Sequence, residues 1–164
     1  MRIADVIQDS IVDGPGFRFV VFTQGCHHNC PGCHNPGTHD ENGGREMAVE
    51  EIIREMRRNP LTDGVTLSGG EPFLQPGPCA DIAEAARADG LNVWAYSGWT
   101  FEQLLERGRE DAATARLLRL LDVLVDGPFV LEKKSMEVKW RGSTNQRLID
   151  VPKSLAAGEA VTLD

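Results

Sequence analysis

Short apolar segments rich in β-branched and aromatic residues alternate along this chain with segments that have the spacing of amphipathic helices, and this alternation constrains the fold more than any other feature. Repeated strand–helix units favour a mainly parallel sheet with right-handed crossovers. The expected strands cover 17–23, 65–67, 91–96 and 122–126, with an additional edge strand at 146–151. The expected helices cover 47–58, 78–88, a segment that starts at Thr100, and about 112–120.

The expected strands are too few to close a complete (β/α) barrel. We therefore predict an α/β fold, an open partial (β/α) barrel with a mainly parallel sheet. The length of 164 residues suits one domain, and the sequence has no internal repeat, low-complexity tract or linker. The expected organisation is a single domain over residues 1–164.

The charge and hydropathy of the chain exclude several classes of function. Its net charge is −8, whereas nucleic-acid-binding proteins usually carry a basic surface, so we expect no nucleic-acid partner. No segment approaches the about 18 apolar residues of a membrane helix, and the first residues lack the layout of a signal peptide. The expected location is therefore the cytoplasm, without membrane contact. One basic cluster stands out, and we interpret it as a solvated face in preference to a docking patch: Lys133, Lys134, Lys139, Arg141 and Arg147.

Three cysteines, Cys26, Cys30 and Cys33, form a C-x3-C-x2-C pattern directly after the first expected strand. Thiolates are soft ligands that suit iron–sulfur clusters and zinc, so the cysteines alone leave both open. A structural zinc site takes four ligands, and one of the four histidines near the cysteines would complete it: His27, His28, His34 and His39. Otherwise we expect these histidines to face solvent. Cys79 is interpreted as a buried small residue.

Each unusual loop in the sequence follows an expected strand. In parallel α/β folds that edge of the sheet collects ligands, so these loops are expected to converge on one site with the cysteines. Gly69 and Gly70 lack side chains and let the backbone approach a ligand closely. Glu71 either caps the next turn or contacts a ligand ammonium group. Asp126 is either a ligand residue or a turn residue before Gly127.

The cysteine pattern followed by Gly69-Gly70-Glu71-Pro72 resembles the radical S-adenosylmethionine (SAM) superfamily. More narrowly, four segments resemble the proteins that activate anaerobic ribonucleoside-triphosphate reductases: 14–18, 25–35, 122–127 and 140–146. The superfamily often has an aromatic residue where this chain has Gly32, so the resemblance implies contact with adenine through the backbone of Gly32, Cys33 and His34. It also implies an open partial barrel of the radical SAM type.

The resemblance implies a definite chemistry. The three cysteines would bind a four-iron, four-sulfur cluster whose open iron chelates the methionine end of SAM. The SAM-contacting residues would include Gly69, Gly70 and Glu71, with Ser97 and Asp126 on the ribose or carboxylate side. One electron from a flavodoxin or ferredoxin-like donor would cleave SAM to a 5'-deoxyadenosyl radical. That radical would take a hydrogen atom from a glycine of anaerobic ribonucleotide reductase. The resemblance suggests a homodimer or an assembly with the reductase.

Other functions stay open at this point. A radical SAM enzyme acting on another glycyl-radical enzyme or on a small molecule would usually need a longer chain. A zinc-stabilised binding module and an electron carrier belong to different classes. The role of 140–146 is open between capping an element and contacting a partner.

Overall fold

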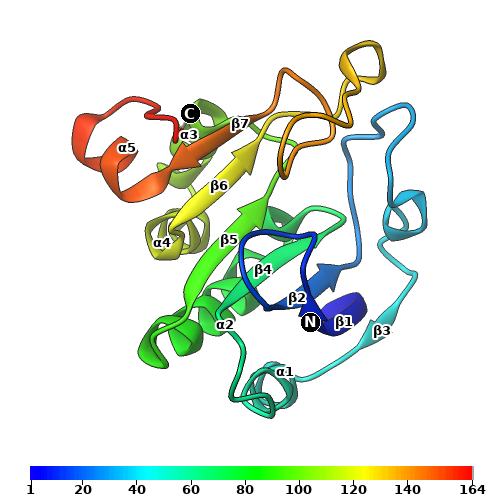
Figure 1. The fold of residues 1–164 in the computed structure, drawn as a ribbon, viewed down its shortest axis with the longest axis vertical. Coiled ribbons are helices and arrows are strands. Elements are labelled where there is room, and N and C mark those ends of the chain that lie inside the picture. The colour runs from blue at the N-terminus through cyan, green and yellow to red at the C-terminus, as the bar shows by residue number, and fades with distance from the viewer. Residues whose placement is uncertain (164) are drawn as a thin grey trace.

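The computed structural model describes residues 1–163. They form a fold built on one seven-stranded sheet (Figure 1). The strands lie side by side in the order β3-β1-β2-β4-β5-β6-β7. Their bounds are β1 Arg2–Ser10, β2 Arg18–Thr23, β3 Arg45–Glu46, β4 Gly64–Gly69, β5 Asn92–Tyr96, β6 Val123–Asp126 and β7 Arg147–Asp150.

The centre of the sheet is parallel, and its edges are antiparallel. Strands β2, β4, β5 and β6 run parallel to one another, while β1 and β3 at one edge and β7 at the other run antiparallel to their neighbours. The predicted open, mainly parallel α/β sheet is confirmed. So are the four central strands and the edge strand near 146–151, whereas β1 and β3 were not expected.

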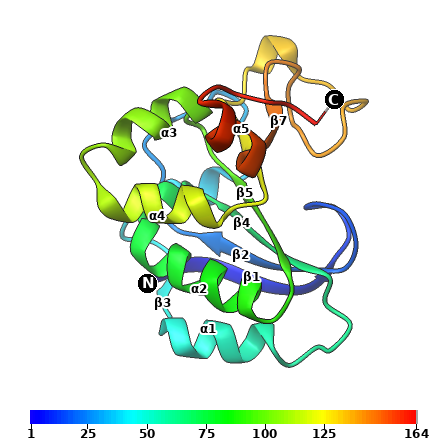
Figure 2. The ribbon, with the colours of Figure 1, turned by 90° about the vertical axis from the view of Figure 1, so that its left-hand side faces the viewer.

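Within residues 1–163, five α-helices connect or follow the strands, and α1 to α4 cover one side of the sheet (Figure 2). Their bounds are α1 Val49–Met56, α2 Pro76–Ala88, α3 Phe101–Gly108, α4 Ala112–Leu120 and α5 Val151–Ala157. Helix α3 starts at Thr100 as expected, with a capping box in which the Thr100 hydroxyl accepts from Gln103 N–H while the Gln103 side chain accepts from Thr100 N–H. Helix α5 was not expected; Asp150 caps its beginning and left-handed Gly158 ends it.

The two faces of the sheet differ because successive strand residues point to opposite sides. On the helix-covered face, alternate residues of the central strands enter the main apolar core, which includes Phe19, Val21, Val65, Leu67, Val93, Ala95 and Leu124. On the opposite face, a smaller cluster contains Trp94, Val123, Val125 and Leu148. Loops 11–17 and 127–146 contact this second face through hydrogen bonds and a ring contact between Trp94 and Trp140. We call it the open face, since no α-helix of the described chain packs on it.

A fully buried arginine lies on the open face. The guanidinium of Arg18 donates to the Thr66 hydroxyl at 2.7 Å and to the carbonyls of Val65 and Pro15 at 2.8 and 2.9 Å. It also lies 5.6 Å from the centre of the Trp94 ring. Burial lowers the pKa of Arg18 to about 10. Through these bonds Arg18 ties loop 11–17 to the sheet.

None of the helices described is long and apolar enough to cross a membrane. The predicted location in the cell stays a prediction.

Candidate active site

The three clustered cysteines meet at one cavity beyond the carboxyl ends of the parallel strands. This cavity, which we call the cysteine cavity, has a volume of about 110 Å³. Its walls come from the loops that follow β2, β4, β5 and β6, as expected for a parallel sheet. The lining residues are Cys26, His28, Cys30, Cys33, His39, Gly69, Gly70, Tyr96, Ser97, Gly98, Gly127, Phe129 and Gln146. The predicted convergence of the cysteine loop with the glycine loops is therefore confirmed.

The cysteine loop is held open by its own turns. The Cys33 N–H donates to the Cys30 carbonyl at 3.1 Å, and the Asn35 N–H donates to the Cys33 sulfur at 3.4 Å. Gly32 has a left-handed backbone with φ 74°. Burial raises the pKa of the Cys26 thiol, and the nearby Glu71 carboxylate adds to this increase. Metal binding at Cys26 must therefore displace a proton.

The donor set fits a cluster of several irons. Among residues 1–163, no three histidine, cysteine or acidic side chains converge closely enough to hold a single metal ion. A four-iron cubane is a larger body, so its three thiolates surround a space and need not converge on one point. Cys26, Cys30 and Cys33 line the same space and are each partly exposed.

The paired glycines are required by the packing of the protein itself. A Cβ atom at Gly69 would lie 2.4 Å from the Thr23 nitrogen, and one at Gly70 would lie 2.3 Å from the Gly25 carbonyl oxygen. The loop also donates a hydrogen bond from Glu71 N–H to that Gly25 carbonyl at 2.8 Å. The glycine loop thus packs against the base of the cysteine loop, and any side chain there would separate the two.

Glu71 is buried beside the cavity and accepts hydrogen bonds from three loops. Its carboxylate accepts from the Ser97 hydroxyl at 2.9 and 3.0 Å and from the Gly98 N–H at 2.8 Å. It also caps the turn that follows it, by accepting from the Phe73 N–H at 3.1 Å. Of the two roles left open for Glu71, capping is therefore observed. Direct contact with a ligand stays a prediction, as does the ligand role of Ser97, whose hydroxyl is directed to Glu71.

His28 joins the cysteine loop to this network. Its Nε2 lies 2.7 Å from a Glu71 oxygen, and its ring packs edge-on against Trp99 at a centroid distance of 4.7 Å. The side chain is only 16% exposed, so the expectation of a solvent-facing histidine is wrong here. That expectation holds for His27, which is 61% exposed and pairs with Glu41. Nothing in the local sequence separates these adjacent histidines, because the contact that distinguishes them comes from Glu71 in the loop after β4.

Asp126 lies outside the cysteine cavity. It shares a face of β6 with Leu124, which belongs to the helix-side core, and its carboxylate accepts from Phe101 N–H at the start of α3 at 2.7 Å. Arg147 lies directly opposite on β7 and donates to Asp126 at 2.6 and 3.0 Å. These bonds raise the pKa of Arg147. The observed role is to join α3, β6 and β7; the predicted SAM contact is untested.

A larger groove continues outward from the cysteine cavity. This outer groove has a volume of about 620 Å³ and shares Cys33, Gly69, Tyr96, Phe129 and Gln146 with the cavity. Its outer walls are formed by loop 11–17 and by residues 134–142. His34 lines the groove, with its ring 5.1 Å from that of Phe129. A hollow of about 650 Å³ lies elsewhere, near Phe17 and Leu61, and none of its lining residues is a cysteine.

Residues 140–146 close a hairpin beside the site. The Gln146 side chain accepts from the N–H groups of Gly142 and Ser143 at 2.8 and 3.2 Å, and donates to the Gly127 carbonyl at 3.0 Å. Asn145 donates to the Pro128 carbonyl at 2.8 Å. These bonds hold the groove wall to the loop that follows β6, and the two roles predicted for this segment, capping and partner contact, stay predictions.

Comparisons with known proteins agree with the site. The family model described as "4Fe-4S single cluster domain" matches residues 12–149. The anaerobic ribonucleoside-triphosphate reductase-activating protein of Salmonella typhi is 36% identical over 155 residues, which cover 89% of this chain and 96% of that protein. The chain belongs to this family of activating proteins. The relative from Enterobacteria phage T4 is 33% identical over 147 residues, covering 84% of this chain and 86% of its own.

Membership of the activating-protein family makes the chain a radical SAM activating enzyme whose cofactors are a four-iron, four-sulfur cluster and SAM. It favours the cluster over zinc. The pyruvate formate-lyase-activating enzyme of Clostridium pasteurianum is also similar, with 39% identity over 114 residues that cover 64% of this chain and 48% of that protein. The crystal structure of QueE from Escherichia coli matches with a TM-score of 0.49 and 16% identity, over 60% of this chain and 52% of that one.

Proposed function

We propose that this chain activates an anaerobic ribonucleoside-triphosphate reductase by creating a glycyl radical on it. When bound, the cluster and SAM supply a one-electron cleavage that releases methionine and a 5'-deoxyadenosyl radical able to take a hydrogen atom from a glycine Cα. Glycine is a suitable target because the flanking amides stabilise its radical and no side chain hinders a planar centre. The protein contributes binding, orientation and shielding.

One observation carries this proposal: the three thiols and the two glycine loops after β4 and β5 line a single cavity in a chain of the activating-protein family. We propose Cys26, Cys30 and Cys33 as the cluster ligands. The backbone of Gly69 and Gly70 would then hold the methionine end of SAM, and that of Gly32, Cys33 and His34 the adenine. Glu71 fixes this arrangement by binding the cysteine loop through His28 and the β5 loop through Ser97.

The outer groove supports a macromolecular substrate. It starts at residues shared with the cysteine cavity and ends at two surface loops, so an extended segment of another protein can approach the site along it. Ser97 and Tyr96 line the inner end, and loop 11–17 lines the outer end.

The test is an anaerobic reconstitution with iron and sulfide, followed by SAM, dithionite and the reductase. We expect cluster-dependent 5'-deoxyadenosine and a glycyl-radical signal in electron paramagnetic resonance, both lost in a Cys30→Ala variant. A protein that binds the cluster and cleaves SAM but leaves the reductase without a radical would contradict the assignment of the substrate. A protein that never cleaves SAM would contradict the chemistry.

A second candidate substrate is a glycyl-radical enzyme of the pyruvate formate-lyase type, because the similarity to the Clostridium pasteurianum activating enzyme extends over 114 residues. The same assay with each enzyme in turn decides between the two candidates. The homodimer suggested by the sequence stays a prediction.

A further inference from the structure

A short basic hairpin lies beside the cysteine loop and forms one outer wall of the groove described above. We call residues 131–144 the lysine hairpin. Three of the four lysines in the chain fall within it, at Lys133, Lys134 and Lys139. Backbone bonds order its base: Thr144 N–H donates to the Lys133 carbonyl at 2.9 Å, and Ser135 N–H donates to the Gly142 carbonyl at 3.2 Å. The lysines are therefore presented on an ordered backbone.

The charges of the lysine hairpin are available to a partner. Within residues 1–163, Lys133, Lys134 and Lys139 are exposed and enter no ion pair, whereas many surface arginines do, such as Arg57 with Asp89 and Arg116 with Asp81. Lysine ammonium groups are mobile point charges, which suit a transient encounter better than a fixed bidentate contact. The hairpin is cationic in a chain whose net charge is −8.

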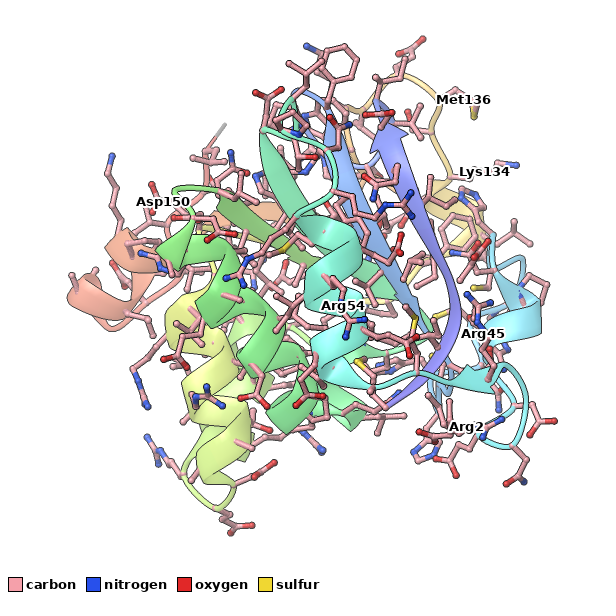
Figure 3. All side chains as sticks on the ribbon, turned by 90° about the horizontal axis from the view of Figure 1, so that it is seen from below. Arg2, Arg45, Arg54, Lys134, Met136 and Asp150 are labelled. Atoms are coloured by element: carbon pink, nitrogen blue, oxygen red, sulfur yellow. The ribbon has the colours of Figure 1, made fainter. Side chains whose placement is uncertain are left out.

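Exposed apolar side chains stand among these lysines. Met136 is 89% exposed and Leu131 is 48% exposed. Figure 3 shows Lys134 and Met136 near each other at one edge of the molecule, whereas Arg54 lies on α1. A small apolar contact surrounded by mobile charge is the composition of a weak, transient interface.

The lysine hairpin also lies directly against the cysteine loop. A Cβ atom at Gly32 would be 2.8 Å from the Leu131 side chain and 3.4 Å from Phe129. The outer groove is lined by Cys33 and by Lys134 and Met136 together. A protein seated on the hairpin therefore lies next to a proposed cluster ligand.

The sequence favoured a solvated face for these lysines, but from their position beside the cysteine loop we infer that the lysine hairpin is the docking surface for an acidic one-electron carrier protein that reduces the cluster. This rests on the proposed function. An acidic carrier is repelled by an anionic chain everywhere except at a cationic patch, so the charge pattern selects both the partner and its orientation. If the carrier is a flavin protein, its anionic hydroquinone loses one electron to become the neutral semiquinone; the oxidised cluster gains that electron, and no proton or bond is exchanged. Weak electron-transfer encounters are also those that use small interfaces.

The test compares charge reversals at matched sites in the cluster-loaded protein. Lys133→Glu/Lys139→Glu changes two exposed lysines of the hairpin that do not line the outer groove, and Arg54→Glu/Arg119→Glu makes the same change of charge on exposed residues of α1 and α4. The probe is an acidic flavodoxin in its hydroquinone form. Its association is measured by biolayer interferometry without SAM or reductase, and its oxidation by stopped-flow absorbance.

We expect the lysine reversals to slow association by about tenfold at low salt, with the difference shrinking as salt increases. The arginine reversals should have a much smaller effect. Glu132→Gln/Glu137→Gln removes the two carboxylates of the hairpin and should speed association. SAM cleavage driven by dithionite should be unchanged in all variants.

Several results would overturn the inference. One is an equal effect of the lysine and arginine reversals, and another is loss of dithionite-driven cleavage in the lysine variant. A third is weaker binding of the reductase with unchanged binding of the flavodoxin, which would assign the hairpin to the protein substrate. Because association is measured without SAM or reductase, a failure of the proposed function appears separately, as SAM cleavage without activation.

Discussion

Two buried carboxylates lie at the carboxyl ends of parallel strands, Glu71 just after β4 and Asp126 at the end of β6, with β5 between the two strands. Their surroundings differ. Asp126 faces the helices and is bound by the guanidinium of Arg147. Glu71 faces the cysteine loop and is bound by a hydroxyl, two N–H groups and the His28 ring. Both are 1% exposed, so burial alone does not distinguish them.

The difference separates a structural carboxylate from one placed to influence a ligand. The charge of Asp126 is neutralised within the protein and joins α3 to two strands. The partners of Glu71 fix its position without supplying an arginine or lysine, so its negative charge acts on the adjacent cavity, where the ammonium and sulfonium of SAM are expected. The hydrogen bonds of Asp126 are structural, and those of Glu71 support the proposal that its charge contributes to ligand binding.

The largest expected effect is a loss of stability when the ion pair between Asp126 and Arg147 is broken. Arg147→Met leaves Asp126 buried with only the Phe101 N–H as a donor, so the free energy of unfolding should fall by about 2 to 3 kcal/mol, because Arg147 itself is partly exposed to solvent. Urea denaturation measures this loss. The pKa of Glu102, which Arg147 lowers, should rise in the same variant.

A double variant provides the control for this pair. Arg147→Met/Asp126→Asn removes the buried charge along with its partner and should recover part of the lost stability. If the free energy of unfolding of the single variant lies within about 0.5 kcal/mol of that of the native protein, the ion pair is not what joins β6, β7 and α3.

The next effect is on the cysteine side. Glu71→Gln directs an amide NH2 at groups that are themselves donors, so we expect a loss of stability of about 1 to 2 kcal/mol. SAM affinity should fall by at least about tenfold, since the charge beside the cavity is gone. Iron content should be retained, because the three cysteines are intact. Ser97→Ala, which keeps the charge and removes one donor, should weaken SAM binding less; an equal loss in both variants would mean that Glu71 acts through position alone.

The sequence predicts the centre of this fold better than its edges. Strands β2, β4, β5 and β6 are covered by helices on one face and by loops on the open face. They are therefore apolar over their length, which makes them recognisable in the sequence. Strand β1 mixes buried Ile3 with exposed Asp5 and Ile7, and its pairing with β3 depends on residues about 40 positions away. No local pattern carries that information.

The candidate site shows the same limit. The cysteines and the glycine loop were predictable because their spacing and their position after strands are local features. The direction of the Asp126 side chain was not predictable. The alternation of side chains along a strand places Asp126 on the same face of β6 as Leu124, but it does not say which face of the sheet the helices cover. The burial of His28 depends on Glu71, 43 residues later in the chain.

The smallest expected effect uses Cys79 as a probe of the Glu71 charge. Cys79 is fully buried in α2, as the sequence suggested, and burial followed by the Glu71 carboxylate raises its pKa from the usual 9.0 to about 12. Because the folded pKa lies above the unfolded one, the neutral thiol favours the folded state below about pH 9, and this contribution is lost as pH rises toward 12.

In a background where the three clustered cysteines are serine, Glu71→Gln should lower the pKa of Cys79, as measured by the ultraviolet absorbance of the thiolate during a pH titration. Ser97→Ala leaves the charge in place and should not shift it. An unchanged pKa of Cys79 in the Glu71→Gln variant would show that burial alone raises it. It would also contradict the claim that the Glu71 charge acts on groups to which Glu71 is not hydrogen-bonded.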